Sequence, residues 1–294
     1  MSACKIDGRD FREASYPAVP TPANFQNNAL TVANLGHATL LMNYFGVRVL
    51  SDPVLFERVG FTIDSVLTIG PHRLIEPPLR PDQLGPIDVI LITHAHMDHL
   101  DIRSLKALPR STTVIACEQC GRLINPLGFY DVRELKWGQT TVVKNLTITA
   151  LGAAHWGTRW PPFGRSYGFN SYLLNRDGVG MFLACDSADT NLFARLHDHP
   201  PEVAAFSIAA YDPWIRNHAN PEQVWRMFTE TGARYLIPIH WGTFRLSKEP
   251  IDEPMRRLLA AAGDASGRVV LRSIGGTWTL PAAVRTRTTD ATAR

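Results

Sequence analysis

The sequence predicts an α/β fold in which two mixed β-sheets pack on each other and helices cover their outer faces. Three observations lead to this fold class. The 294-residue chain is 45% hydrophobic, which is enough to form the core of one large domain. Its first part is rich in short apolar and β-branched runs separated by turns, as in an antiparallel meander. Farther along, such runs alternate with segments of helical spacing, which indicates sheets with helices outside them.

The expected elements follow from these patterns in order along the chain. Strands are expected at 29–35, 38–44, 47–52, 88–94, 112–116, 141–151, 169–174, 180–185, 203–209, 234–240 and 268–274. Helices are expected at 98–108, 190–199, 220–232 and 252–263. The helix at 220–232 has clear end signals, because Asn220 can cap it, Pro221 suits its first turn and Gly232 can end it. The segment from Pro53 to Pro86 is expected to be a long loop, which is typical of functional or lid segments.

One large domain is expected to span residues 28–282. Residues 1–27, which are rich in Pro and Ala, are expected to form an N-terminal arm on the surface. Residues 283–294 are expected to form a flexible C-terminal tail.

Charge and hydropathy restrict the partners and the location. The chain has 30 Lys and Arg against 27 Asp and Glu, a net charge of +3, which disfavours nucleic acid as a partner. The first residues lack the apolar core of a signal peptide, and no apolar run is as long as a membrane span. The cytoplasm is therefore the expected location, and the sequence is compatible with transient membrane contact. No pattern in the sequence indicates the oligomeric state.

The four cysteines predict no disulfide framework. Cys117 and Cys120 form a single C-x-x-C, and neither Cys4 nor Cys185 lies at a spacing that would complete a structural zinc site. Chance or simple packing is favoured for this pair over a redox or metal role.

The main chemical signal is the segment THAHMDHLD, from Thr93 to Asp101. It follows an expected strand, so that His94 and His96 project to the same side. Asp98 and His99 come from the turn that follows. Three imidazoles and a carboxylate within six residues are the ligand types that zinc and similar metals prefer.

Three further ligand-type residues directly follow apolar strands. His155 comes after 141–151, Asp186 after 180–185 and His240 after RYLIPI. Side chains at the carboxyl ends of strands commonly build the sites of α/β proteins. We therefore expect these residues to join the cluster that begins at His94.

These residues resemble the H-x-H-x-D-H signature of the metallo-β-lactamase superfamily, and the downstream order His, Asp, His fits as well. The narrower resemblance is to its N-acyl-phosphatidylethanolamine phospholipase D-like and ascorbate-6-phosphate lactonase-like branch. The motifs that carry it lie between residues 28 and 247: GHATLLM (36–42), SDP (51–53), HAHMDHLD, AYDPW (210–214), NHANPEQ (217–223) and IHWGTF (239–244). The resemblance implies the αββα sandwich of that superfamily.

The resemblance also implies two divalent metal ions, with zinc as the first expectation and manganese or iron accepted by the same donors. One metal would be held by His94, His96 and His155, the other by Asp98, His99 and His240, with Asp186 between them. A hydroxide bridging the two metals would attack the substrate.

Residues around the ligands take roles from the same resemblance. Asp52 is expected to orient a ligand histidine, and His37 is expected near the site or the substrate. Asp98 and His218 are expected to take part in catalysis, with His218 contacting the substrate or the leaving group.

The implied activity is that of a phosphodiesterase acting on a small-molecule or lipid-like diester. A lactonase or other ester hydrolase on the same metals is the alternative, and a non-catalytic metal-binding sensor is a second one. A nuclease is disfavoured by the small net charge. Apolar residues in the segments Phe56–Leu67 and Trp156–Phe163 could form either a hydrophobic mouth or a packed lid, and the lid is favoured because exposed apolar patches are unusual.

Overall fold

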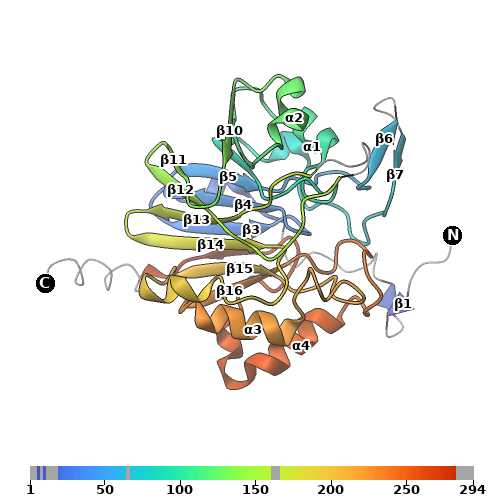
Figure 1. Ribbon diagram of the computed structural model, residues 1–294, viewed down its shortest axis with the longest axis vertical. Coiled ribbons are helices and arrows are strands. Elements are labelled where there is room, and N and C mark those ends of the chain that lie inside the picture. The colour runs from blue at the N-terminus through green and yellow to red at the C-terminus, as the bar shows by residue number, and fades with distance from the viewer. Residues whose placement is uncertain (1–4, 7–8, 11–18, 64–66, 160–165, 283–294) are drawn as a thin grey trace, which may run out of the picture.

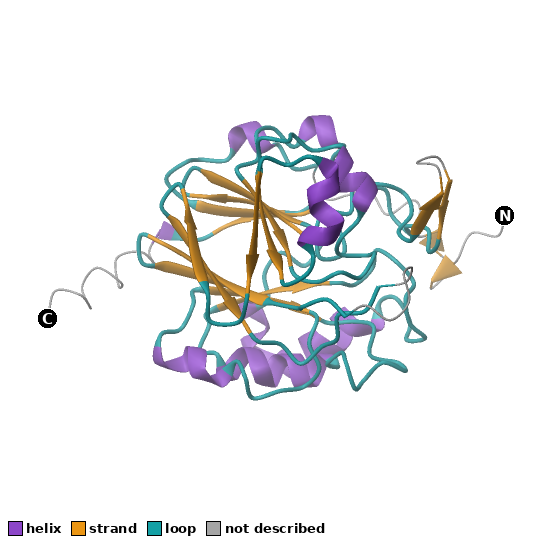
Figure 2. Ribbon diagram, turned by 45° about the horizontal axis from the view of Figure 1, so that its top comes forward, coloured by secondary structure: helices purple, strands orange, loops and turns teal. Residues whose placement is uncertain are grey.

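The computed structural model describes residues 5–6, 9–10, 19–63, 67–159 and 166–282. Two mixed β-sheets lie face to face between outer helices (Figure 1; Figure 2). Helices α1 (Ile102–Lys106) and α2 (Gly121–Ile124) cover the outer face of one sheet. Helices α3 (Pro221–Glu230) and α4 (Glu253–Ala262) cover the other. The predicted fold class is confirmed.

The first sheet contains seven strands in the described part of the chain, in the order β10–β9–β8–β5–β4–β3–β17. The strands are β3 (Leu30–Asn34), β4 (Leu40–Tyr44), β5 (Val47–Ser51), β8 (Val89–Ile92), β9 (Thr113–Cys117), β10 (Asp131–Leu135) and β17 (Thr277–Thr279). Strands β5, β8, β9 and β10 are parallel, whereas the other neighbours pair antiparallel.

The second sheet has the order β11–β12–β13–β14–β15–β16. The strands are β11 (Thr140–Val143), β12 (Leu146–Leu151), β13 (Ser171–Arg176), β14 (Val179–Cys185), β15 (Val203–Ser207) and β16 (Tyr235–Ile239). Strands β14, β15 and β16 are parallel, and the remaining pairs are antiparallel.

Two small antiparallel pairs lie outside the sheets: β1 (Lys5–Ile6) with β2 (Arg9–Asp10), and β6 (Phe61–Ile63) with β7 (Leu67–Ile69). The second pair shows that the segment predicted as a long loop contains a hairpin. Short 3₁₀ helices occur at Pro22–Asn24, Pro81–Gln83, Asn125–Leu127, Ala194–Asp198 and Gly263–Arg268.

Three predicted elements are wrong in detail. The single strand at 141–151 is a hairpin, because Lys144 and Asn145 both take positive φ (46° and 68°) and form its tight turn. The predicted helix at 190–199 is only a 3₁₀ helix, which ends before Pro200, where the residue preceding a proline disfavours helical backbone. The predicted strand at 268–274 makes only an isolated bridge between Leu236 and Val269.

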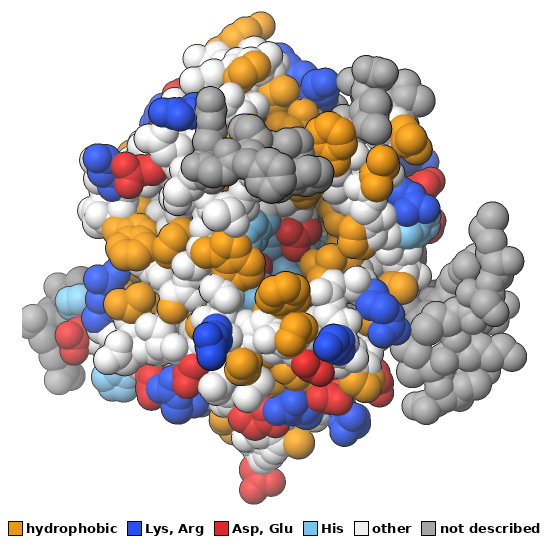
Figure 3. Space-filling view, turned by 45° about the vertical axis from the view of Figure 1, so that its right-hand side comes forward, with side chains coloured by type: hydrophobic (Ala, Val, Ile, Leu, Met, Phe, Trp, Pro, Cys, Tyr) orange, Lys and Arg blue, Asp and Glu red, His pale blue; other side chains and the backbone are white. Residues whose placement is uncertain are grey.

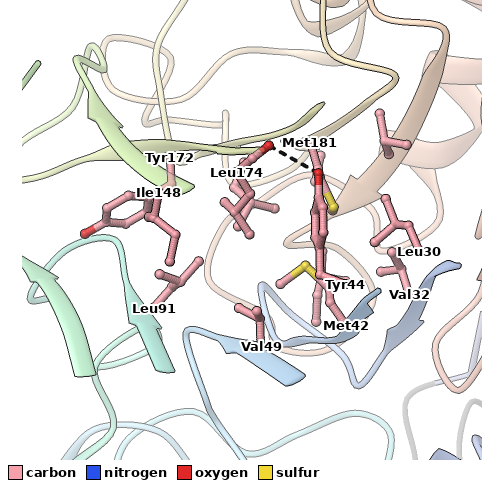
Figure 4. Close-up of a cluster of buried hydrophobic side chains, with 14 of the residues drawn as sticks. Leu30, Val32, Met42, Tyr44, Val49, Leu91, Ile148, Tyr172, Leu174 and Met181 are labelled. Carbon is pink, nitrogen blue, oxygen red and sulfur yellow. Dashed lines mark hydrogen bonds between the residues drawn. The ribbon is translucent and has the colours of Figure 1, made fainter. Parts of the chain in front are cut away.

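The principal core lies between the two sheets and consists of apolar side chains from both (Figure 4). Two tyrosines connect the sheets by hydrogen bonds inside it. The hydroxyl of Tyr44 donates toward the carbonyls of Val179 at 2.6 Å and Leu174 at 3.2 Å. The hydroxyl of Tyr172 donates to the carbonyl of Ile92 at 2.9 Å. The Tyr172 contact holds the end of β8, next to His94, against β13, and the Tyr44 contacts join the sheets near the start of β14.

Several predictions fall outside the described residues. The tail at 283–294 lies wholly outside them, and the arm at 1–27 lies partly outside. Residues 64–66 and 160–165 interrupt the two segments predicted as a lid or a mouth. Among the described helices, none combines the length and the apolar character needed to cross a membrane.

Substitution of Tyr44 by Phe is expected to lower the free energy of unfolding by about 1–2 kcal/mol, because two buried carbonyls lose a hydroxyl donor. Urea denaturation measures this change. Tyr130→Phe is the matched control, since Tyr130 is 83% exposed and should be neutral. Equal stability of the two variants would show that the inter-sheet hydrogen bond contributes nothing.

Candidate metal centre

Ligand-type side chains gather where strands of both sheets end at one edge of the sandwich. His94 follows β8 of the first sheet, and Asp186 and His240 follow β14 and β16 of the second. Figure 3 shows histidine and acidic side chains at the bottom of a hollow on the face that lies to the right in Figure 1. The site therefore lies between the two sheets and opens to the surface.

The backbone bends sharply at the strand ends that carry these side chains. His37, Asp52, Cys185 and His240 all have left-handed φ values, of 55°, 34°, 53° and 68°. For residues other than glycine such conformations cost on the order of 1–3 kcal/mol each and persist only when the surroundings fix them. Their concentration at one edge is typical of a functional site.

His94, His96 and His155 form a first group of possible ligands. The Nε2 atoms of His94 and His155 lie 2.8 Å and 3.4 Å from Nδ1 of His96. His155 Nδ1 donates to the carbonyl of Asn217 at 3.0 Å, and His94 Nδ1 lies 3.0 Å from the hydroxyl of Thr93. With these Nδ1 atoms protonated, the Nε2 lone pairs of His94 and His155 point toward His96. A cation between the three rings could accept all the lone pairs together.

Asp98, His99 and His240 form a second group. Asp98 Oδ2 lies 3.6 Å from Nε2 of His99 and 3.4 Å from Nε2 of His240. Both Nε2 atoms are buried and make no hydrogen bond within the described residues. Buried polar atoms without partners are costly, and a metal ion would satisfy them.

Asp186 connects the two groups. Its Oδ2 lies 3.0 Å from Nε2 of His99 and 3.2 Å from Nε2 of His240. The same oxygen lies 3.9 Å from Nε2 of His94 and of His155. One carboxylate oxygen thus faces histidines of both groups, which is the position that a shared ligand would need.

Burial and the two carboxylates set the pKa values of the cluster. Burial raises the pKa of Asp186, but the attraction of His240 and His99 outweighs it and holds this pKa well below its usual range. Burial lowers the pKa of His94 far below its usual value and that of His96 to about 4. Burial lowers the pKa of His99 and His240, but the charge of Asp186 outweighs it and raises the pKa of His99 well above its usual value and that of His240 to about 9. Divalent metals bind ionised carboxylates and neutral imidazoles, so a metal ion would take the place of the protons on these two rings, and the donor set fits such an ion.

Asp52 is the centre of a hydrogen-bond network behind the ligands. Its carboxylate accepts from the backbone N–H of Thr93 at 2.8 Å, the Thr93 hydroxyl at 2.6 Å and Nδ1 of His99 at 2.8 Å. The thiol of Cys185 donates to the same carboxylate at 3.2 Å. The contact with Nδ1 orients the His99 ring so that its Nε2 is directed at Asp186.

His37 and His218 lie at the border of the cluster. His37 Nε2 is 2.9 Å from Asp98 Oδ2, and its ring centroid lies 4.0 Å from that of His240. The His218 ring lies 5.1 Å from His155 and 5.5 Å from His240. Nδ1 of each is buried without a hydrogen-bond partner among the described residues, so each can still bind another group.

Sequence reasoning missed two supporting residues. Arg159 donates from Nη1 to the carbonyls of Ala95 at 2.7 Å and Leu100 at 2.8 Å, and so it holds both ends of the loop that carries the histidines. Ser207 donates to Asp186 Oδ1 at 2.5 Å. Neither belongs to a ligand-type motif. The position of Ser207 at the end of β15, between two ligand-bearing strands, was the available signal.

Apolar side chains surround the hollow, as Figure 3 shows. On the β6–β7 hairpin, Phe61, Leu67 and Ile69 are 41%, 58% and 57% exposed. Trp214 and Ile215, from the loop that leads to His218, are also exposed. The described part of the predicted lid segment is thus mixed: Val59 is buried and Phe56 packs against the core, whereas the side chains of Phe61 and Leu67 face solvent.

Trp156 forms an aromatic wall inside this rim. Its ring lies 4.6 Å from His96 and 4.4 Å from His155. On the other side of the site, Phe244 lies 5.3 Å from the His37 ring and pairs through its backbone with Arg73, beyond the end of β7. The polar cluster is thus set among aromatic side chains.

Comparison with known proteins is consistent with this arrangement. The sequence model of a beta-lactamase superfamily domain matches residues 48–241. An uncharacterised protein of Mycobacterium tuberculosis is 33% identical over 265 residues, which cover 85% of this chain and 70% of that protein. The N-acyl-phosphatidylethanolamine-hydrolyzing phospholipase D 1 of Caenorhabditis elegans is 28% identical over 308 residues, covering 86% of this chain and 81% of that protein.

A solved structure shares the fold. The crystal structure of an isothiocyanate hydrolase from Delia radicum gut bacteria superposes with a TM-score of 0.69 and 18% sequence identity. The superposition covers 86% of this chain and 99% of that chain.

Removal of divalent metal by a chelator is expected to lower the Tm by about 5 °C or more, because Asp98 and Asp186 lose the cation that balances their buried charge. Thermal denaturation with and without EDTA, followed by addition of zinc, measures the effect. The exposed His199 provides the control variant His199→Ala, which should respond as the wild type does, whereas Asp186→Ala should not respond. A wild-type Tm that is insensitive to both reagents would contradict metal binding.

Proposed function

Since the chain belongs to the metallo-β-lactamase superfamily and to its N-acyl-phosphatidylethanolamine phospholipase D-like branch, we propose that it is a two-metal hydrolase of phosphodiesters. The observation that carries the proposal is the position of Asp186, whose Oδ2 faces ligand-type histidines from both groups within 3.0–3.9 Å. A single tetrahedral site would not need so many donors.

The donors divide into two sets around Asp186. One metal would be held by His94, His96 and His155, and the other by Asp98, His99 and His240, with Asp186 shared. When bound, divalent ions make hydroxide available near neutral pH and polarise an ester oxygen. Zinc is the first expectation for this His/Asp set, and manganese or iron can replace it according to supply.

The chain's own residues keep the donors in their binding form. Asp52 accepts the Nδ1 proton of His99, and the carbonyl of Asn217 accepts that of His155. Each contact directs Nε2 toward the other donors and restricts rotation of the ring. Such supporting contacts typically change metal affinity by about 10- to 100-fold.

His218 is proposed to contact the substrate. It is 6% exposed, it lies beside His155 and Asp186, and its Nδ1 has no partner in the described residues. A hydrogen bond from this ring to the leaving-group oxygen would assist departure. His37 is proposed to act through Asp98, which it contacts at 2.9 Å, and thus to fix the orientation of that carboxylate.

The exposed apolar rim supports a diester with an apolar part. Ligand pockets bury most of their ligand against hydrophobic walls. The β6–β7 hairpin, which connects to the site through the contact of Val59 with Phe244 and of Phe244 with His37, carries Phe61, Leu67 and Ile69 as exposed apolar surface. The relative from Caenorhabditis elegans is named as a phospholipase D that hydrolyses N-acyl-phosphatidylethanolamine. A lipid-like diester is therefore the proposed substrate class.

A substrate panel tests the proposal: bis-p-nitrophenyl phosphate, an N-acyl-phosphatidylethanolamine in mixed micelles, an acyl lactone and a β-lactam, each with zinc and with manganese. The kcat/KM for the better diester should exceed those for the lactone and the β-lactam by at least about tenfold. A preference for the lactone would replace the phosphodiesterase by an ester hydrolase. Absence of turnover with intact metal content would indicate a metal-binding protein without activity.

The lipid part of the proposal has its own variant pair. Leu67→Asp should lower kcat/KM for the micellar lipid and leave that for bis-p-nitrophenyl phosphate unchanged, because only the larger substrate reaches the hairpin. Val142→Asp is the control, since Val142 is 52% exposed on β11, outside the rim. Equal effects of the two variants would remove the hairpin from substrate binding.

Asp186→Asn is expected to reduce activity more than His218→Ala, because only Asp186 serves both metals. Loss of one proton-transfer or hydrogen-bonding residue such as His218 costs about 10²–10⁴-fold. Elemental analysis should find two metal ions per wild-type chain, a similar number in His218→Ala and fewer in Asp186→Asn. Small and equal losses of activity, with unchanged metal content in both variants, would contradict the shared role of Asp186.

A further inference from the structure

A second pair of reactive side chains lies outside the metal centre, in the CEQC turn at residues 117–120. Cys117 is the last residue of β9, and Cys120 directly precedes α2. Their Sγ atoms are only 3.0 Å apart, both residues are completely buried, and both thiols are free. The two sulfurs face each other, and the reaction proposed for the metal centre uses neither of them.

The backbone of the turn holds the sulfurs in this position. The N–H of Cys120 donates to the carbonyl of Cys117 at 3.3 Å, and between them Gln119 takes a left-handed φ of 68°. A glutamine adopts this conformation only at some cost, so the surrounding structure must stabilise it. One such restraint is the contact of Gly121 N–H with Glu134 Oε1 at 2.6 Å.

We propose that Cys117 and Cys120 form a reversible intramolecular disulfide in the folded protein, with a low-molecular-weight disulfide such as oxidised glutathione as the oxidant. An S–S bond is about 2.05 Å long, so the sulfurs need to approach by only about 1 Å. No other described cysteine competes, because Cys185 contacts Thr93 and Asp52 at the metal centre instead.

The reaction balances as two thiol–disulfide exchanges. One cysteine thiolate attacks a sulfur of oxidised glutathione, the glutathione S–S bond breaks, and one glutathione thiolate leaves. The second cysteine thiolate then attacks the mixed disulfide and releases the second glutathione. The two cysteines are oxidised, one glutathione disulfide is reduced to two thiols, and the cysteine protons pass to the departing thiolates.

Access to the pair requires a local opening of the turn, because both cysteines are completely buried. The residues next to Cys120 in the sequence, Gln119 and Gly121, line a surface hollow, and Gln119 is exposed, so the opening needed is that of this one turn. Burial and the hydrogen bond with Cys120 raise the pKa of Cys117 well above its usual value, so little of its thiolate is present and oxidation should be slow.

The turn is also connected to the metal centre. The carbonyl of Glu118 accepts from the N–H of Gly168 at 2.8 Å, and the next residue, Phe169, pairs with His94. Oxidation therefore acts on a segment only two backbone contacts away from a proposed ligand. The disulfide itself does not depend on the proposed function and can be tested without it.

Mass spectrometry of the full-length protein provides the test. The native protein is equilibrated in glutathione buffers of graded redox ratio, then acid-quenched, denatured and treated with N-ethylmaleimide. Trypsin cuts after Arg110 and Arg122 and so releases both cysteines in one peptide, 111–122. We expect this peptide to lose two hydrogens and take up no N-ethylmaleimide, at a ratio at least about tenfold more reducing than urea-denatured protein requires.

Two outcomes would overturn the proposal. One is that the native pair needs a redox ratio as oxidising as the denatured chain needs, which would mean that the fold does not favour the bond. The other is a peptide that keeps glutathione as its final product. Cys117→Ser is the control, in which Cys120 can form only the mixed disulfide. If that variant does not fold, the comparison of native and denatured wild-type protein decides alone.

Discussion

The site depends on one buried negative charge placed between two sheets. The Asp186 side chain is only 2% exposed, and its Oδ2 faces His94 and His99 from the first sheet and His240 from the second. A carboxylate can remain ionised at such a place only when positive charge or donors surround it. Both sheets must therefore be held in one relative position. The hydrogen bond of Tyr172 to Ile92 provides that restraint where β8 and β13 approach the cluster, and Tyr44 joins the sheets again near the opposite end of β14.

The same requirement accounts for the unusual backbone at the strand ends. A regular strand would carry Cys185, Asp52 and His240 past the edge of the sheet, whereas left-handed φ values turn each chain back toward the cluster. These left-handed conformations persist because the residues that adopt them make hydrogen bonds within the site. Asp52 accepts three hydrogen bonds from Thr93 and His99, and His240 N–H donates to the carbonyl of His37 at 2.9 Å. The fold therefore stabilises the orientation of the ligand-type side chains before any metal binds.

Sequence reasoning reached the fold class and brought the seven ligand-type residues to one edge, because a dense local motif and the strand-end rule are visible in the sequence itself. It succeeded with α3, whose cap and first-turn proline are local signals. It missed β10, where Arg133 and Glu134 interrupt the apolar pattern at the edge of the first sheet, as is common in edge strands. It missed Arg159 and Ser207 because their contacts join residues that are far apart in the sequence. Tertiary contacts of this kind leave no periodic pattern to detect.

The substrate is harder to predict from the sequence than the type of reaction, and the structure shows the physical reason. The ligand-type residues sit at the ends of strands, where sheet pairing dictates their positions. The rim instead comes from the β6–β7 hairpin and from the loop that carries Trp214 and Ile215, which pack little against the core and can change without disturbing it. Groups of exposed apolar side chains are unusual on the surface of a soluble protein and commonly mark a binding site. The proposed substrate class rests on this combination, because a ligand that is polar at one end and apolar along its length could contact both surfaces at once.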